Sequence, residues 1–270
     1  MPELPEVETV ARGLAKRVNG DVIESIWLGS KKEPLKSPAR LIARTLENTR
    51  IAAVRRVGKQ IVFDLLSAEG TPKQWIVHLG MTGQMLVCPP ESEIKKHTHA
   101  IAKLASGREL RFVDPRRFGR LSVASNGDFA GTGLEPLEIS DDSFLALFRG
   151  RKTPIKSALL NQKLLGGVGN IYADESLFRA GIRPRRRAGS LTREQFKKLH
   201  SSLKKVLREA IRLGGSSISD YVDADGQEGF FQLRHRVYGR EGEPCYVCKT
   251  PIKRVVIAGR SSHYCPMCQR

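Results

Sequence analysis

The sequence predicts an α+β protein of several domains, with an antiparallel β-sandwich or barrel first, a helical region next and a small zinc finger last. Residues 21–113 hold short apolar segments bounded by Gly or Pro, which is typical of antiparallel sheets. Residues 139–213 follow helical periodicity instead, and residues 245–268 hold two Cys-x-x-Cys pairs. A chain of 270 residues with 40% hydrophobic content can bury more than one core.

The first predicted element is a helix that begins near Pro5. Apolar residues recur at three- and four-residue steps from Val7 to Val18, and proline suits the first helical position. Glu6 and Glu8 lie in the first turn, where carboxylates complement the positive end of a helix. This interpretation leaves the residues ahead of Pro5 without a role.

Those preceding residues also allow a catalytic interpretation. Removal of Met1 would turn the ring nitrogen of Pro2 into a free secondary amine. An α-amino group has a reference pKa of about 7.7 to 8.0, against about 10.4 for lysine, so more of it is nucleophilic near neutral pH. Such amines form Schiff bases with carbonyl carbons, and the adjacent Glu3 can donate or accept the proton.

Seven short strands and one helix are expected next. The strands span residues 21–28, 50–57, 60–66, 75–79, 84–87, 100–104 and 109–113, and the helix spans residues 38–46. Gly58 and Lys59 separate two of the strands and predict a tight hairpin with the lysine at its tip. A lysine on an exposed turn is usually only solvated, so the turn alone assigns it no function.

Two loops in this half carry large side chains between turn residues. Residues 78–83 place Met81 between two glycines, and residues 114–119 contain Arg116, Arg117 and Phe118. An apolar tip beside arginines can enter a base stack while the cations hold phosphates. The alternative is that Met81 and Phe118 turn inward and cap the sheet.

Two further signals are weaker. His97 and His99 are two residues apart and would share one face of a strand, but no further metal ligands lie nearby in the sequence. Cys88 has no neighbouring cysteine and is expected to be a small buried apolar residue.

The second half is strongly basic. The whole chain has a net charge of +18, and residues 151–213 alone carry 16 Lys plus Arg against 4 Asp plus Glu. Nucleic acid is the polyanion that this balance favours, and an anionic membrane surface is the competing partner. No apolar run approaches the roughly 20 residues that span a bilayer, and the acidic start is unlike a secretory signal. We therefore expect a cytoplasmic protein without a membrane partner.

Two helix starts are predicted in this basic region. Glycines lead into Asn170, which suits an N-cap, and backbone N–H groups at such a start can approach a phosphate. Thr192 and Gln195 form a capping box ahead of an amphipathic helix with Phe196, Leu199, Leu203, Val206, Ala210 and Leu213 on its apolar face. The domains expected are residues 1–130, a linker over 131–138, a helical domain over 139–233 and a finger over 234–270.

The C-terminal cysteines predict one structural Zn²⁺. Cys245, Cys248, Cys265 and Cys268 have the spacing of a four-cysteine zinc site. Two disulfides are the alternative, although a cytoplasmic chain keeps its thiols reduced. Four thiolates leave no open coordination position, so the metal stabilises a β-hairpin finger and takes no part in catalysis.

Five collinear motifs resemble the bacterial formamidopyrimidine-DNA glycosylases. They are residues 2–9 (PELPEVET), residues 78–83 (HLGMTG), residues 114–119 (DPRRFG), residues 167–173 (GVGNIYA) and the four-cysteine finger. They span nearly the whole chain in the family's order. The resemblance implies an N-terminal β-sandwich, a helix-two-turn-helix domain and a zinc finger.

The resemblance also implies a monomeric repair enzyme that acts on duplex DNA with oxidised purines, 8-oxoguanine and formamidopyrimidines, at the nucleoid. By this resemblance Pro2 is the nucleophile that forms a Schiff base at C1′, followed by β- and δ-elimination. Glu3 and Lys59 are proton donors, and Glu6 and Lys156 support the active site. Three residues fill the gap left by the flipped base, namely Met81, Phe118 and Arg116, and Arg116 faces the orphaned cytosine.

The other DNA-binding residues expected from the resemblance are His78, His99, Arg117, Asn170, Tyr238 and Arg260, and residues 216–229 would cover the flipped base. Ser262 departs from a threonine common at the finger. Two alternatives remain at this point. An endonuclease VIII-like enzyme for oxidised pyrimidines usually has Gly in place of Leu4, and a non-catalytic zinc-ribbon DNA-binding protein gives the acidic N-terminus no role.

Overall fold

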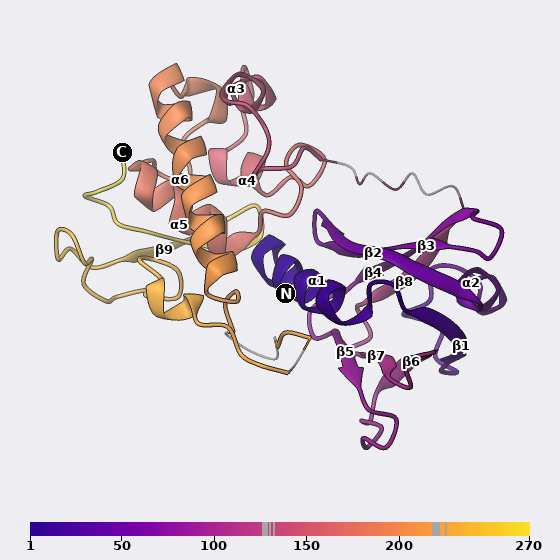
Figure 1. Ribbon diagram of the computed structural model, residues 1–270. Coiled ribbons are helices and arrows are strands. Elements are labelled where there is room, and N and C mark those ends of the chain that lie inside the picture. Colours follow the sequence, from indigo (N-terminus) through magenta and orange to yellow (C-terminus); the bar gives the residue numbers. More distant parts are fainter. Residues whose placement is uncertain (126–128, 130, 132, 218–221, 225) are drawn as a thin grey trace. The chain divides into compact units, whose positions relative to one another are not determined.

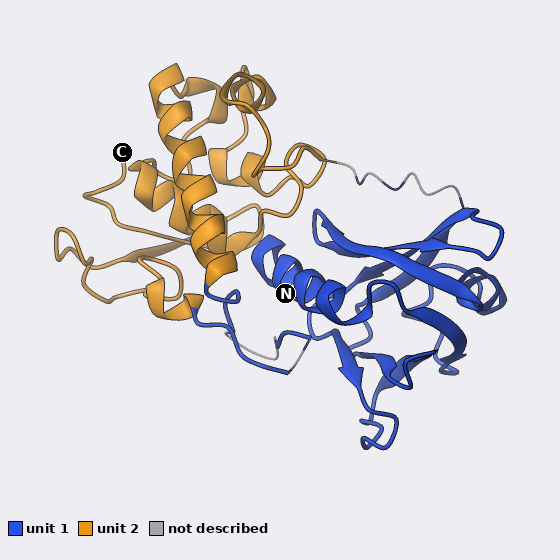
Figure 2. Ribbon diagram, viewed as in Figure 1, with its two compact units in different colours: residues 1–131, 213–230 blue, residues 132–212, 231–270 orange. Residues whose placement is uncertain are grey.

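The computed structural model describes residues 1–270 except 126–128, 130, 132, 218–221 and 225, and the chain divides into two compact units (Figure 2). Unit 1 comprises residues 1–131 and 213–230, and unit 2 comprises residues 132–212 and 231–270. Unit 1 is therefore discontinuous in sequence, because it takes up a segment that follows the longest helix of unit 2.

Unit 1 is built on an antiparallel sheet in the order β5-β7-β6-β1-β2-β3-β4-β8 (Figure 1). Its strands are β1 (Val22–Leu28), β2 (Thr49–Val57), β3 (Gln60–Leu66), β4 (Pro72–His78), β5 (Gln84–Cys88), β6 (Thr98–Leu104), β7 (Glu109–Val113) and β8 (Arg120–Ala124). β1 pairs with β2 only through Val22 and Ile23, whereas its pairing with β6 extends to Leu28. The sheet folds at this junction into two layers.

One hydrophobic core fills the space between the layers. Phe63 and Trp75 stack from β3 and β4 with ring centroids 5.0 Å apart, and Met85 and Phe112 enter from β5 and β7. Helix α1 (Leu4–Val18) adds its apolar stripe to the same core, and α2 (Ala39–Leu46) adds Ile42 and Leu46. The antiparallel sandwich is thus confirmed.

Sequence patterns located most of these elements but missed β8. This strand has one fully buried residue, Leu121, and its other positions are exposed or half-buried. Its alternation is therefore too weak to detect. β8 forms because it pairs with β4, with His78 opposite Arg120 at one end.

The segment that returns to unit 1 is tied to α1. The backbone N–H of Ser216 donates to Oε1 of Glu6 at 2.8 Å, and the Cβ of Ala224 lies 3.1 Å from where a Cβ on Gly13 would be. Gly215 has a φ of +85°, and a Cβ there would lie 2.9 Å from the Glu6 carboxylate. Glycine permits both the backbone angle and the close approach.

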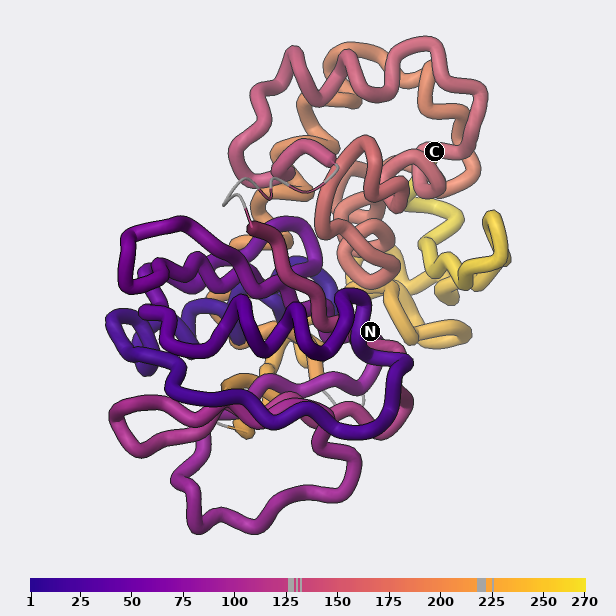
Figure 3. The backbone as a smooth tube through the Cα atoms, turned by 90° about the vertical axis from the view of Figure 1, so that its right-hand side faces the viewer, coloured from indigo at the N-terminus to yellow at the C-terminus, as the bar shows by residue number. Residues whose placement is uncertain are grey.

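Unit 2 packs helices above a small hairpin. The helices are α3 (Asp141–Phe148), α4 (Ile155–Leu159), α5 (Asn170–Ala180) and α6 (Arg193–Arg212), with short 3₁₀ turns η1 (Ala188–Ser190) and η2 (Phe231–Arg234). β9 (Lys253–Ile257) and β10 (Arg260–Tyr264) form the hairpin, which is yellow near the end of the trace in Figure 3. No helix within the described ranges is long and apolar enough to cross a membrane.

The predicted capping box of α6 is confirmed. Thr192 N donates to Gln195 Oε1 at 3.0 Å, and Gln195 N donates to Thr192 Oγ1 at 3.2 Å. The apolar face of α6 is buried from Phe196 to Ala210, while Leu213 lies beyond the helix and is half-buried.

The prediction that Asn170 caps α5 is wrong. Gly169 takes the N-cap position with extended backbone (φ −128°, ψ −165°), and Asn170 is the first helical residue. The amide of Asn170 is used elsewhere, as described below, so the helix start depends on the backbone of Gly169 and not on a capping side chain.

Candidate active site and nucleic-acid interface

The N-terminal residues are held to the start of α1 by reciprocal hydrogen bonds. Glu3 is the N-cap residue, its carboxylate accepts from the backbone of Glu6, and its own N–H donates to Glu6 Oε2 at 2.8 Å. Pro2 and Glu3 are buried, with Glu3 4% exposed, while Met1 is exposed. The two candidate catalytic residues therefore occupy fixed positions at the positive end of a helix.

Both oxygens of the Glu6 carboxylate serve the local structure. Oε2 accepts from Glu3, and Oε1 accepts from Ser216 in the returning segment. The helix-start interpretation is thus correct for Glu6, and it adds a second task that local sequence did not reveal. Glu6 joins the N-terminus to residues 213–230.

The predicted hairpin places Lys59 at a two-residue turn between β2 and β3. Val57 pairs with Gln60, and Gly58 has a φ of +60°. Arg56 donates through Nε to Glu8 Oε2 at 2.7 Å and through Nη1 to the Gly58 carbonyl at 3.1 Å. Because the Arg56 side chain is only 6% exposed, it connects the turn firmly to α1.

The loops over residues 78–83 and 114–119, called here the wedge loops, share one buried carboxylate. Asp114 is fully buried and accepts from Thr82 Oγ1 at 2.6 Å, from Gly119 N at 2.7 Å and from Arg116 N at 3.3 Å. A Cβ on Gly80 would lie 2.5 Å from the backbone of residues 118 and 119. The two loops therefore contact each other through their backbones.

This scaffold holds the large side chains outward. Met81 is 37% exposed and Phe118 is 55% exposed, and the guanidinium of Arg116 lies 5.0 Å from the centre of the Phe118 ring. The alternative that Met81 and Phe118 turn inward to cap the sheet is wrong. What remains is an exposed tip of apolar and cationic groups on a rigid base, which can enter a stack of bases.

Two histidines lie beneath the tip. His78 accepts through Nδ1 from Gly80 N at 2.9 Å, and His99 Nε2 lies 2.9 Å from the Asp114 carbonyl. Burial, together with the charges of Arg120 and Lys59, lowers the pKa of His78 to about 4, so its ring is neutral at pH 7. Within the described ranges, the four cysteines form the group of three or more residues that could hold a metal ion, and His97 and His99 belong to no such group.

In unit 2, Lys156 is a fully buried cation. Its Nζ lies 2.7 Å from Asp174 Oδ1, and it donates to the carbonyl of Ser261 in the finger at 2.6 Å. Asp174 Oδ2 in turn accepts from His263 N at 2.8 Å. This network fastens β10 to α4 and α5.

The exposed Arg260 begins β10, beside these bonds, and Asn170 Nδ2 lies 3.4 Å from Ser261 Oγ. Asn170 and Arg260 therefore come from the two elements that the buried ion pair holds together. Residues that bind one stretch of nucleic-acid backbone need such a fixed relation.

A second buried acid holds the segment before the finger, and sequence reasoning missed it. Glu175 is fully buried, and its carboxylate accepts from the backbone N–H groups of Arg236, Val237 and Tyr238 at 2.9 to 3.0 Å. Burial raises the pKa of Glu175, although these N–H groups oppose that shift. Its only sequence signal is a pair of adjacent acids in an otherwise basic, apolar region.

The same bonds fix the backbone of Tyr238, whose ring meets those of His263 and His235 edge-on at 5.2 and 5.6 Å. Tyr238 therefore presents its half-buried side chain from an anchored position.

The four cysteines meet as the spacing predicted. Their sulfur atoms all lie within 4.8 Å of one another, and two of the pairs are 3.3 and 3.9 Å apart. A disulfide requires about 2.05 Å, whereas four thiolates about 2.3 Å from one zinc ion are separated by distances of this size. The prediction of one structural Zn²⁺ held by Cys245, Cys248, Cys265 and Cys268 is confirmed, with support from the family match below.

Family models match three consecutive parts of the chain. Residues 1–121 match the formamidopyrimidine-DNA glycosylase N-terminal domain, residues 133–222 match the H2TH domain of the same glycosylases, and residues 242–270 match a zinc finger found in FPG and IleRS. Together the three models cover most of the sequence.

Individual relatives agree over their whole length. Formamidopyrimidine-DNA glycosylase of Solibacter usitatus is 47% identical over 272 residues, covering 100% of both chains. The crystal structure of MutM (Fpg) from Thermus thermophilus has a TM-score of 0.87 and 43% identity, covering 99% of this chain and 98% of that one. A complex between a Lactococcus lactis Fpg variant and DNA containing Fapy-dG has a TM-score of 0.91 and 34% identity, covering both chains completely.

The shared carboxylate of the wedge loops is open to a direct test. Asp114→Asn leaves one of the three donors without an acceptor, which costs about 1–3 kcal/mol for a buried group. We expect cleavage of lesion-containing duplex to fall about tenfold, as loss of about 1.4 kcal/mol would give. Cleavage of a single-stranded abasic oligonucleotide should stay within about twofold, because no stack is entered. Equal losses on both substrates would contradict this role.

For Lys156, the buried ion pair predicts a stability defect. Lys156→Met leaves the carboxylate of Asp174 buried without its cation, which costs about 3–5 kcal/mol. Urea unfolding of the full chain measures this, and adding Asp174→Asn should recover part of the loss. Unchanged unfolding together with lost lesion cleavage would instead show that the lysine contacts the lesion directly.

Removing the zinc should abolish DNA binding before it unfolds unit 1. The chain has two tryptophans, Trp27 and Trp75, and both lie in unit 1, so tryptophan fluorescence reports on that unit alone. Chelation or Cys248→Ser should remove duplex binding while the fluorescence is retained. Cys88→Ser is the matched control and should have no effect, and unchanged affinity in zinc-free protein would refute the finger's role.

Proposed function

This chain belongs to the formamidopyrimidine-DNA glycosylase family, and we propose that it acts through its N-terminal proline. The family assigns it base-excision repair of oxidised purines, with DNA glycosylase and abasic-site lyase activities on damaged duplex DNA, as a monomer. The observation that carries the proposed mechanism is the burial and fixed position of Pro2 and Glu3 at the start of α1.

In this mechanism the Pro2 amine attacks C1′ of the damaged nucleotide after Met1 is removed. The N–C1′ bond forms as the glycosidic bond breaks, and opening of the sugar leaves an iminium ion, which is the Schiff base. β-Elimination then breaks the bond from C3′ to its phosphate oxygen, and δ-elimination breaks the one at C5′. Hydrolysis of the iminium ion returns the free amine.

Glu3 supplies the proton to the departing base, because it is adjacent to the nucleophile and held by its own helix cap. Lys59 is the second proton donor, and the contacts of Arg56 with Glu8 and Gly58 set the direction of its turn. Both oxygens of Glu6 are occupied by backbone N–H groups. Its proposed task is to fix Pro2 and Glu3.

We assign the DNA contacts by position. Met81 and Phe118 enter the base stack, and Arg116 reads the orphaned base, because all three project from the scaffold of Asp114. Extrusion of a nucleotide costs a few kcal/mol, which contacts to phosphates and the inserted side chains offset. His78 and His99 act beneath these residues by holding the wedge loops.

Four other residues complete the proposed interface, namely Arg117, Asn170, Tyr238 and Arg260. Lys156 supports the site by fastening the finger that carries Arg260. A cover for the flipped base is proposed over residues 216–229, of which 218–221 and 225 lie outside the described residues.

We propose a catalytic domain over residues 1–130, a linker over 131–138, a helix-two-turn-helix domain over 139–233 and a zinc finger over 234–270. A substrate of damaged duplex DNA supports action in the bacterial cytoplasm, at the nucleoid.

Borohydride trapping tests the nucleophile. Protein whose N-terminus is shown by mass to be Pro2 should form a covalent complex with an 8-oxoguanine oligonucleotide paired to cytosine. An N-terminal extension that cannot be removed should abolish trapping, because it converts the amine into a peptide nitrogen. Pro2→Gly should reduce it strongly. A covalent complex that still forms with the N-terminally extended protein would refute the mechanism, since another amine would then carry out the reaction.

A further inference from the structure

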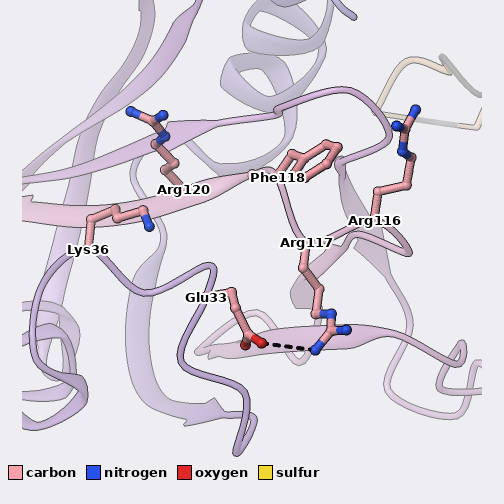
Figure 4. Close-up of a pocket in the computed structure, with 7 residues that line it drawn as sticks. Glu33, Lys36, Arg116, Arg117, Phe118 and Arg120 are labelled. Carbon is pink, nitrogen blue, oxygen red and sulfur yellow. Dashed lines mark hydrogen bonds and ion pairs between the residues drawn. The ribbon is translucent and has the colours of Figure 1, made fainter.

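A cationic pocket lies against the wedge loop over residues 114–119, and three of its lining residues, Glu33, Lys36 and Arg120, have no part in the mechanism above. It is lined by Glu33, Lys36 and residues 116–120 (Figure 4). Four of the lining side chains are cations and one is an acid, and all five are exposed. A concave site with a net positive charge suits an anion.

The two walls of the pocket are joined by backbone hydrogen bonds. Lys36 N donates to the Leu121 carbonyl at 2.8 Å, and Leu121 N donates to the Pro34 carbonyl at 2.7 Å. Lys36 is therefore held alongside β8, where Leu35 pairs with Leu121 in parallel, and it lies two residues from Pro34, the position opposite Arg120. The two cations sit on a fixed scaffold, so little order has to be created when a ligand binds.

The third cation, Arg117, forms only a weak ion pair with Glu33. Arg117 Nη1 donates to Glu33 Oε1 at 3.1 Å, and Figure 4 shows Arg117 turned toward Glu33 while Arg116 extends elsewhere. Both side chains of the pair are largely exposed, and exposed ion pairs contribute little because water and salt screen them. A ligand with stronger negative charge can therefore replace Glu33 as the partner of Arg117.

The backbone of Arg117 gives an independent indication of function. Its φ is +58°, in the left-handed region that costs a residue with a side chain about 1–2 kcal/mol. Such strained positions persist where the surrounding structure imposes them and cluster at ligand sites. At this backbone angle the Arg117 side chain points toward Glu33 and away from Arg116 (Figure 4).

The pocket also continues toward the proposed catalytic face of unit 1. Arg120 lies opposite His78 on the neighbouring strand, and His78 lies opposite Gln60, the residue after Lys59. This line across adjacent strands has the cations Arg120 and Lys59 at its two ends and the neutral His78 between them. The two cations can contact separate phosphates of one nucleic-acid backbone.

We propose that this pocket binds a backbone phosphate of the duplex next to the base step that Met81 and Phe118 enter, with the phosphate displacing Glu33 from Arg117. The inference rests on the proposed function, because it takes the wedge loops to enter DNA. Lys36 and Arg120 are the primary ligands, and Glu33 is a competitor that lowers affinity for the duplex.

The test measures duplex affinity against salt, with an uncleavable abasic analogue as the lesion. Each phosphate contact contributes about 0.9 to the slope of log affinity against log salt, so Lys36→Gln and Arg120→Gln should each lower the slope by about 1. Glu33→Gln should raise the affinity for the duplex, whereas the two cation variants should lower it. Lys103→Gln, a change of the same kind at an exposed lysine on β6, should leave slope and affinity unchanged.

Neutral methylphosphonate linkages identify the strand whose phosphate binds in the pocket. A single linkage is placed at successive positions of the lesion strand and then of the opposite strand. At one position the linkage should weaken binding by the wild-type protein but cause no further loss in Lys36→Gln. Slopes equal to wild type in both Lys36→Gln and Arg120→Gln, or weaker binding by Glu33→Gln, would overturn the proposal.

Borohydride trapping on a single-stranded abasic oligonucleotide separates this failure from that of the proposed function. If the wild type and all four variants are trapped and the salt slopes of the variants equal that of the wild type, the phosphate pocket is rejected and the proline mechanism is retained. Absence of trapping in wild type rejects the proline mechanism, whatever the slopes show.

Discussion

The carboxylate of Glu6 is the constraint on which the proposed catalytic site of this protein depends. One oxygen closes the helix cap that positions Pro2 and Glu3, and the other accepts from Ser216, 210 residues further along the chain. A buried carboxylate is tolerated only where its oxygens are satisfied, and here backbone N–H groups and the positive end of α1 satisfy them. Moving either partner would leave both a buried charge and a misplaced N-terminus.

Buried acidic side chains likewise hold the segments that carry the proposed DNA contacts. Asp114 joins the two wedge loops, Glu175 anchors the segment that carries Tyr238, and Asp174 pairs with Lys156 beneath the finger. In a chain with a net charge of +18, these acids lie inside and bind backbone or a buried cation, while most of the cations face solvent. Positive surface and internal order thus come from separate sets of charges.

This separation explains what the sequence could predict. Features that depend on neighbours in sequence were found, such as the four-cysteine spacing, the Gly58-Lys59 turn and the Thr192 capping box. Features that join distant residues gave no local signal. Lys156 meets Ser261 across 105 positions, and β8 exists because β4 is beside it. Asn170 was misplaced by one position because Gly169 needs no side chain to begin the helix.

The discontinuity of unit 1 has a consequence for the order of biosynthesis. Its sheet is encoded entirely before residue 125, yet the Ser216 partner of Glu6 follows much later. At about 5–20 residues per second, the ribosome makes residue 216 about 10–40 s after residue 6. The β-sandwich can therefore form while the nascent chain is still growing, but the N-terminal cap stays incomplete until most of the DNA-binding unit has been translated.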